Sequence, residues 1–304
     1  MTTAPYAHPL RAGALALGSA LLFALSALTF RLSVAAQAET GVHALLVAFG
    51  MERILGCALL LAIWGKPRMA HWRGNAVAGA LVTTGSLAYY FALSTAALGV
   101  AVTLCDSYNL LAVVLAAVLA RKFPSRANLL MLVLAFVGAA VCARPSPHTG
   151  SPLGVAGAVM AAVLFAVALL SQRRQVANGA RTQDILAWMY ACSVVPLGLY
   201  ALLARPVLPG WHAFAYSALT ALLTLGGNYL AVQAQRFGSL MQVGALVYST
   251  GVFSTALAWL LLRERMDAVT LAGIALVIAG GVGSTVLEHR GRRAAQASVA
   301  IAAG

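Results

Sequence analysis

The sequence is a succession of apolar blocks, each about twenty residues long, separated by short polar segments. A helix needs about this many residues to cross the roughly 30 Å hydrocarbon core of a bilayer. We therefore predict ten membrane-spanning helices, at residues 12–36, 41–64, 74–97, 98–120, 125–143, 153–173, 183–204, 211–235, 239–262 and 267–287. The polar segments are too short to form a soluble domain, so residues 1–304 are predicted to fold as a single all-α membrane domain.

The composition excludes a soluble protein. Hydrophobic residues make up 62% of the chain and charged residues only 9%, whereas soluble domains are about a quarter charged. The formal net charge of +13 reflects membrane topology and does not predict a nucleic-acid surface, because the basic residues gather in alternate polar segments. With the N-terminus inside, fourteen fall in inner segments and five in outer ones. We expect a multi-pass protein of the bacterial cytoplasmic (inner) membrane with both termini in the cytoplasm.

The sequence contains no motif for catalysis or cofactor binding. Its four cysteines form no CxxC pair, its six histidines fall in loops, tails or span ends, and it has no Gly-rich phosphate loop, nucleophile elbow or HExxH motif. We expect no metal site, no cofactor and no enzymatic activity, since a membrane enzyme would need a nucleophile, a base or metal ligands clustered at one membrane face.

The two halves of the chain resemble each other after a shift of about 140 residues. The string Ala20–Ala24 matches Ala162–Ala166, and Tyr90-Phe-Ala92 matches Tyr229-Leu-Ala231. We predict two repeats, residues 12–143 and 153–287. Each holds five helices, an odd number, so the second repeat must enter the membrane inverted relative to the first.

The charges of equivalent loops agree with this inversion. The basic loop 121–126 is predicted inside, and its counterpart 263–267, which contains Glu264 and Asp267, outside. Inverted repeats are the usual architecture of secondary transporters, whose halves rock about a site near the midplane. Gene duplication could also give a channel, so this alternative remains open beside a transporter.

Three ionisable residues fall in the middle of predicted spans: Glu52, Arg53 and Asp106. Such residues are costly in hydrocarbon and are candidates for function. They could bind the amino and carboxyl groups of a zwitterionic substrate, or a carboxylate could exchange a proton during transport. Alternatively, Arg53 forms a fixed ion pair with Glu52 or Asp106. Adjacent helical residues diverge by about 100°, so Arg53 and Glu52 cannot both face one cavity, and we favour Asp106 as the cavity-facing acid.

Polar and aromatic residues occur at matching places in the two repeats. Tyr89 and Tyr90 match Asn228 and Tyr229, and the segment 107–109 of the fourth span matches 248–250 of the ninth. Hydroxyls and amides in mid-span need partners, which a watery cavity or a neighbouring helix can supply. The predicted substrate-binding residues are Asp106, Tyr108, Tyr89, Tyr90, Asn228, Tyr229, Tyr248, Ser249 and Arg53. The alternative for each is helix packing.

Several strings resemble the drug/metabolite transporter superfamily in its ten-span form with two EamA-type repeats. They are the apolar run around Arg53 (Ala48–Ala58), the aromatic string Tyr89–Gly99 with its counterpart Asn228–Gly238, and the ending Leu260–Gly281. The first repeat departs from the family at Arg121-Lys122, where a Glu is frequent, and at Asp106–Asn109, where a Pro is common. These departures bear on the subfamily and leave the fold unchanged.

Within the superfamily, the chain looks most like the YddG-type aromatic amino-acid exporters. This resemblance implies a transporter that exports small metabolites, amino acids first, by alternating access; other metabolites and drugs are the alternative substrates. The expected partners are a small-molecule substrate and the lipid bilayer, with no nucleic acid, and a monomer is the default expectation.

Overall fold

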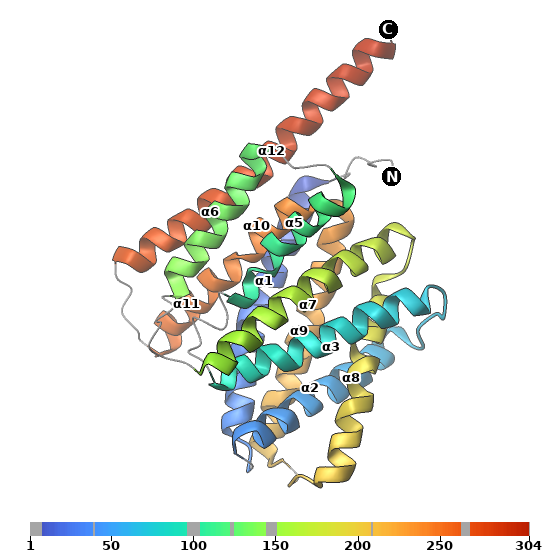
Figure 1. Cartoon of the computed structure of the whole chain (residues 1–304), viewed down its shortest axis with the longest axis vertical. Coiled ribbons are helices and arrows are strands. Elements are labelled where there is room, and N and C mark those ends of the chain that lie inside the picture. The colour runs from blue at the N-terminus through green and yellow to red at the C-terminus, as the bar shows by residue number, and fades with distance from the viewer. Residues whose placement is uncertain are drawn as a thin grey trace.

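The protein is described by a computed structural model that covers residues 8–38, 40–95, 104–121, 125–143, 151–207, 209–262 and 268–303. All regular secondary structure in these residues is helical (Figure 1). The helices are α1 (Pro9–Ala35), α2 (Gly41–Trp64), α3 (Trp72–Thr95), α5 (Tyr108–Ala120), α6 (Arg126–Ala143), α7 (Pro152–Ala177), α8 (Thr182–Ala204), α9 (Trp211–Phe237), α10 (Leu240–Val247), α11 (Ser249–Leu262) and α12 (Ala268–Ala303).

The all-helical prediction is confirmed, and the helices follow the apolar blocks. Four helices, α1, α2, α7 and α8, are each long and apolar enough to cross a membrane, and shorter apolar helices lie at Leu104–Ala120, Arg126–Val141, Leu240–Ser254 and Leu271–Leu287. The number of ten spans stays a prediction. Residues 98–103 of the predicted fourth span and the loop 263–267 lie outside the described residues.

The last helix is longer than predicted. We expected the tenth span to end at residue 287, but α12 continues to Ala303 and extends beyond the rest of the bundle (Figure 1). Hydropathy detects the part of a helix that suits hydrocarbon, and it gives no signal where a helix continues into a polar sequence.

Two helices are interrupted at equivalent places. Ser107 (φ −57°, ψ −13°) precedes α5, and Tyr248 (φ −59°, ψ −16°) separates α10 from α11. At each interruption a hydroxyl group donates a hydrogen bond to the backbone carbonyl three residues earlier. Ser107 Oγ donates to the Leu104 carbonyl (2.6 Å), and Thr250 Oγ1 donates to the Val247 carbonyl (2.7 Å). Such bonds compete with the helical ladder and bend it. The predicted fourth and ninth spans therefore share one local distortion.

The helices pair across the two halves of the chain. The most extensive contacts join α1 to α9, α3 to α7, and α6 to α12. Smaller contacts join α2 to α9, α3 to α8, α1 to α11, and α5 to α7. The counterparts of α1, α2, α3, α5 and α6 in the second half are α7, α8, α9, α10–α11 and α12. Exchanging each helix for its counterpart turns the α1–α9 contact into α7–α3, α2–α9 into α8–α3 and α1–α11 into α7–α5, and it leaves α6–α12 unchanged. This pattern is consistent with two repeats related by a two-fold axis, and the inverted repeat itself stays a prediction.

Small residues allow α1 to approach α9 closely. Alanines recur on one face of α1 at four-residue spacing, and Ala12, Ala16, Ala20 and Ala24 are all buried. Hydroxyls join the same two helices: the Ser33 and Ser217 Oγ atoms are 2.6 Å apart, and Thr220 donates to Thr29 (2.9 Å). In lipid such contacts replace the hydrophobic effect as the force that holds helices together.

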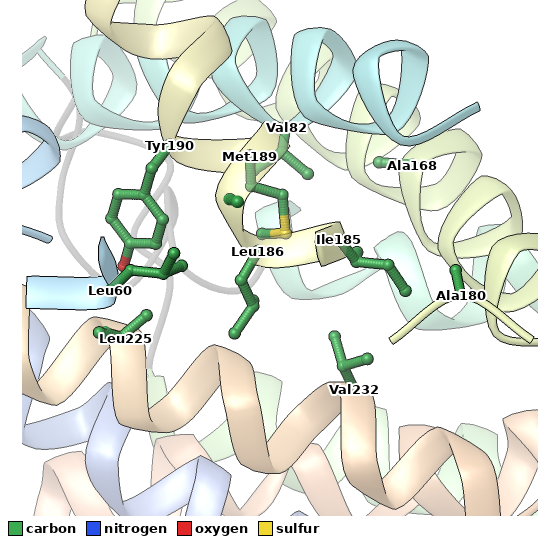
Figure 2. Close-up of a cluster of buried hydrophobic side chains, with 11 residues drawn as sticks. Leu60, Val82, Ala168, Ala180, Ile185, Leu186, Met189, Tyr190, Leu225 and Val232 are labelled. Carbon is green, nitrogen blue, oxygen red and sulfur yellow. The ribbon is translucent and has the colours of Figure 1, made fainter. Parts of the chain in front are cut away.

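Larger side chains fill the core around α8. Figure 2 shows Ile185, Leu186, Met189 and Tyr190 of α8 within a cluster that also takes residues from α2, α3, α7 and α9. On the outside of the bundle, by contrast, leucines such as Leu202 and Leu203 are about three-quarters exposed (76% and 77%), as expected where the surrounding solvent is lipid.

The contact between α6 and α12 gives a test of this packing. A Cβ added to Gly138 would lie 2.6 Å from the Val277 backbone nitrogen and 2.7 Å from the Gly273 carbonyl, so Gly138→Ala must push the two helices apart. We expect it to lower the free energy of unfolding by about 1–3 kcal/mol, measured by thermal unfolding in detergent.

Gly198→Ala is the matched control, because a Cβ there meets no atom within 4 Å and the substitution favours the helix. Equal unfolding temperatures for the two variants would contradict a tight α6–α12 interface.

Candidate functional site

A cavity of about 240 Å³ lies among the helices near the middle of their length. Its walls come from α1, α2, α3, α7, α8, α9, α10 and α11, together with the residues around the Ser107 interruption. Aromatic lining residues are Phe23, Phe30, Tyr89, Tyr90, Tyr108 and Phe165. Polar lining residues are Ser26, Arg53, Ser86, Asp106, Gln172, Thr224, Asn228, Gln235, Thr250 and Ser254. The cavity therefore combines aromatic faces with a few polar groups, the usual make-up of a small-molecule site.

Six of the nine predicted site residues line this cavity: Arg53, Tyr89, Tyr90, Asp106, Tyr108 and Asn228. The other three, Tyr229, Tyr248 and Ser249, do not. Tyr229 instead stacks on Trp64 (ring centroids 5.3 Å apart), and its hydroxyl accepts a hydrogen bond from Gln233. Tyr248 is fully buried against Phe136 (5.6 Å). Ser249 is adjacent to Tyr248, and on that segment Val247 and Thr250 are the residues that reach the cavity.

The lining positions repeat along the chain. Phe23, Ser26, Ala27 and Phe30 of α1 differ by 142 in number from Phe165, Ala168, Leu169 and Gln172 of α7. The same offset relates Val82, Ser86 and Tyr89 of α3 to Thr224, Asn228 and Ala231 of α9. The sequence match of Tyr90 with Tyr229 implies an offset of 139 residues, three fewer than the offset of 142 that relates the lining residues. Asn228 corresponds to Ser86 in the cavity wall, and not to Tyr89.

Phe23 and Phe165 are lining residues that the sequence reasoning did not select. Both lie in the matching strings Ala20–Ala24 and Ala162–Ala166, which served there only as evidence of a repeat. Large aromatic residues conserved between the two halves were the available signal. Gln172 of α7 and Gln235 of α9 are buried and also line the cavity. No match between the two halves pointed to these amides.

Arg53 is held in the cavity wall by several contacts. Its Nε lies 2.9 Å from Glu52 Oε2, as an ion pair whose N–H is not aligned for a hydrogen bond, and its Nη2 donates to Ser86 Oγ (3.3 Å). The guanidinium carbon also lies over the rings of Phe49 (4.9 Å) and Tyr190 (5.2 Å). Nη1 is buried and has no hydrogen-bond partner among the described residues. The protein thus engages the guanidinium on several sides, and Nη1 itself is buried.

Of the two ion pairs considered for Arg53, the structure contains the one with Glu52. Both side chains are almost fully buried (3% and 0% exposed), but only Arg53 lines the cavity. This is the divergence expected of neighbouring residues on a helix.

Asp106 also lines the cavity and is half-buried. Within the described part of the chain, its carboxylate makes no hydrogen bond and no ion pair. Tyr89 and Tyr108 lie close enough to interact with it electrostatically, and the Tyr108 ring meets Phe165 edge-on (5.9 Å). Buried charges are normally paired, so an unpaired carboxylate in a cavity indicates a place for a cationic group of a ligand.

Arginines tie the helix ends together at the predicted inner side. Arg173 of α7 donates to the carbonyl of Gly238 (2.6 Å), just after α9, and Arg236 of α9 donates to Thr182 (3.1 Å) and to the Ala180 carbonyl (2.5 Å). Asp184 accepts from Arg181 (2.8 and 2.9 Å) and from the Arg68 backbone N–H (2.9 Å). These bonds cap helix ends and join α7, α8, α9 and the α2–α3 loop.

Comparison with known proteins agrees with this description. Residues 152–286 match the sequence model of the EamA-like transporter family, which is nearly the second predicted repeat. The match supports a place in the drug/metabolite transporter superfamily and points to a membrane transporter, in keeping with the expectation of no enzymatic activity. No curated protein matches the chain.

Solved structures share the fold. One chain, titled "Crystal structure of protein", is 19% identical over 91% of this chain and 98% of its own length, with a TM-score of 0.71. At this identity the likeness concerns the fold alone.

Replacing Asp106 or Asp184 by asparagine should shift the unfolding temperature of the protein in opposite directions. Asp106→Asn removes an unpaired charge from a low-dielectric site, so we expect the ligand-free protein to unfold at a higher temperature than the wild type. Asp184→Asn weakens bonds to Arg181 and Arg68 and should cost about 1–3 kcal/mol. Thermal unfolding in detergent measures both variants. If Asp106→Asn is as destabilising as Asp184→Asn, Asp106 has a structural role.

Proposed function

We propose that the protein is a secondary transporter that exports small metabolites, with aromatic amino acids as the foremost substrates, by alternating access of two inverted five-helix repeats. The observation that carries this proposal is the central cavity, which places an unpaired carboxylate and a partly engaged guanidinium among aromatic rings.

An amino acid fits the chemistry of this wall. Its ammonium group would pair with Asp106, and its side chain would lie between Phe23 and Phe165. The volume of about 240 Å³ is below the range of about 300–1,000 Å³ found for drug-sized ligands. This favours a small metabolite over a drug.

The pseudo-symmetry of the cavity supports alternating access. Seven lining pairs recur at an offset of 142 residues, and the pairings of α1 with α9 and of α3 with α7 are equivalent under exchange of the halves. In inverted repeats such an arrangement allows each half to take up the conformation of the other, which moves the opening of the site from one side to the other.

Flux through reconstituted vesicles tests the proposal. Proteoliposomes loaded with labelled phenylalanine, tryptophan or threonine should lose label faster than protein-free vesicles, and phenylalanine and tryptophan faster than threonine because the wall is aromatic. Asp106→Asn should reduce this flux by at least about tenfold if the ammonium pair contributes about 1.4 kcal/mol. Absence of flux for every amino acid would contradict amino-acid export.

Two further measurements separate related functions. Overexpression should protect cells against toxic aromatic amino-acid analogues, whereas protection against unrelated drugs instead would identify a drug exporter of the same superfamily. Flux that responds to neither a pH gradient nor Asp106→Asn would exclude proton coupling through this carboxylate.

We also propose that the protein lies in a bacterial cytoplasmic membrane as a monomer with both termini in the cytoplasm. The inner-side contacts of Arg173 and Arg236 agree with this orientation because arginine is favoured on that side. A fluorescent protein fused after residue 304 should fluoresce, and alkaline phosphatase at the same position should be inactive. The reverse result would invert the topology.

A further inference from the structure

The charges around the cavity are not balanced. Of the described residues that line it, two are formally charged, Arg53 and Asp106. Behind the wall, Glu52 is fully buried and its Oε2 lies 2.9 Å from Arg53 Nε. Arg53 is thus paired with Glu52, whereas the Asp106 carboxyl group has no counter-ion among the described residues.

From this balance we infer that Glu52 determines the charge specificity of the site: it neutralises Arg53, so an amino group is the required feature of a substrate and a carboxylate is dispensable. The ligand class is therefore aromatic primary amines, with or without a carboxylate. This inference rests on the proposed function, because it concerns the same cavity, and it assigns a role to a residue that does not touch the substrate.

Glu52 can have this effect because a substrate cannot displace it. The carboxylate lies outside the lining, and adjacent helical positions point about 100° apart, so a ligand carboxylate would approach Arg53 from another direction. Ser86 and the rings of Phe49 and Tyr190 hold the guanidinium in place. A second anion beside Arg53 would meet a cation that is already paired and would be repelled by Glu52.

Asp106 has the opposite environment. The neighbouring Tyr89, Tyr108 and Cys105 carry no positive charge, and no described residue pairs with its carboxylate. Next to the lining residues Gln172 and Gln235 in the sequence, Arg173 and Arg236 donate to backbone carbonyls at the helix ends, and Arg236 also donates to Thr182. Binding of an ammonium group thus supplies Asp106 with a counter-ion that the protein does not provide.

Three ligands with the same ring and different charges test the inference on the wild-type protein. Phenethylamine has the ammonium alone, phenylalanine has both groups, and 3-phenylpropionate has the carboxylate alone. Dissociation constants are measured in detergent from ligand-dependent thermal stabilisation, which requires no transport. We expect phenethylamine and phenylalanine to bind within about tenfold of each other and 3-phenylpropionate at least about tenfold more weakly than either.

Glu52→Gln then tests the role of the residue itself. Loss of the buried carboxylate leaves Arg53 with an uncompensated charge, so the ratio of 3-phenylpropionate affinity to phenethylamine affinity should rise by at least about tenfold. Glu52→Asp, which keeps the charge, should retain the wild-type order. Asp184→Asn makes the same acid-to-amide change outside the cavity and should leave the ratio unaltered.

The outcomes separate this inference from the proposed function. If phenylalanine is transported but phenethylamine does not bind, or if Glu52→Gln leaves the affinity ratio unchanged, the inference is wrong and amino-acid export stands. If phenethylamine binds but no amino acid is transported, amino-acid export is wrong and the specificity stands. If Glu52→Gln does not fold, the wild-type series decides, since tighter binding of 3-phenylpropionate than of phenethylamine overturns the inference.

Discussion

In hydrocarbon, a polar group that lacks a protein partner has no water to bind instead, and this constraint shapes the whole structure. It restricts the described chain to helices, and it explains how they are joined. Serine and threonine hydroxyls bridge α1 and α9, and alanines between them let the two backbones approach. The interruptions at Ser107 and Tyr248 are accompanied by hydroxyls that bind the nearby carbonyls.

The same constraint applies to the few charged groups in the bundle, which need a partner or a cavity. Glu52 and Arg53 are adjacent in sequence and nearly inaccessible, and each makes the burial of the other tolerable. Asp106 has no such partner and faces a cavity. One bundle thus holds a buried ion pair, of which only Arg53 faces the cavity, and a cavity-facing acid without a counter-ion among the described residues.

The cavity owes its shape to symmetry and its chemistry to departures from symmetry. Phe23 and Phe165 are identical across the two halves, but Phe30 corresponds to Gln172 and Tyr89 to Ala231. The lining residues of α1 and α3 are therefore more aromatic, and those of α7 and α9 carry the amides of Gln172, Asn228 and Gln235.

The sequence alone located the apolar helices, because the length and polarity of an apolar block are properties of the chain by itself, but it did not show the interruptions at Ser107 and Tyr248 or the end of α12. It also identified Arg53 and Asp106, since a charge in mid-span is visible without coordinates. It could not determine which way each helix turns. The match of Tyr90 with Tyr229 gives an offset of 139 residues, whereas the lining pairs have an offset of 142. A difference of three residues rotates a helical position by about 60°. This rotation places Asn228 in the cavity wall and Tyr229 against Trp64. Only the packing of α1 on α9 and of α3 on α7 fixes those rotations, and with them the residues that share a site.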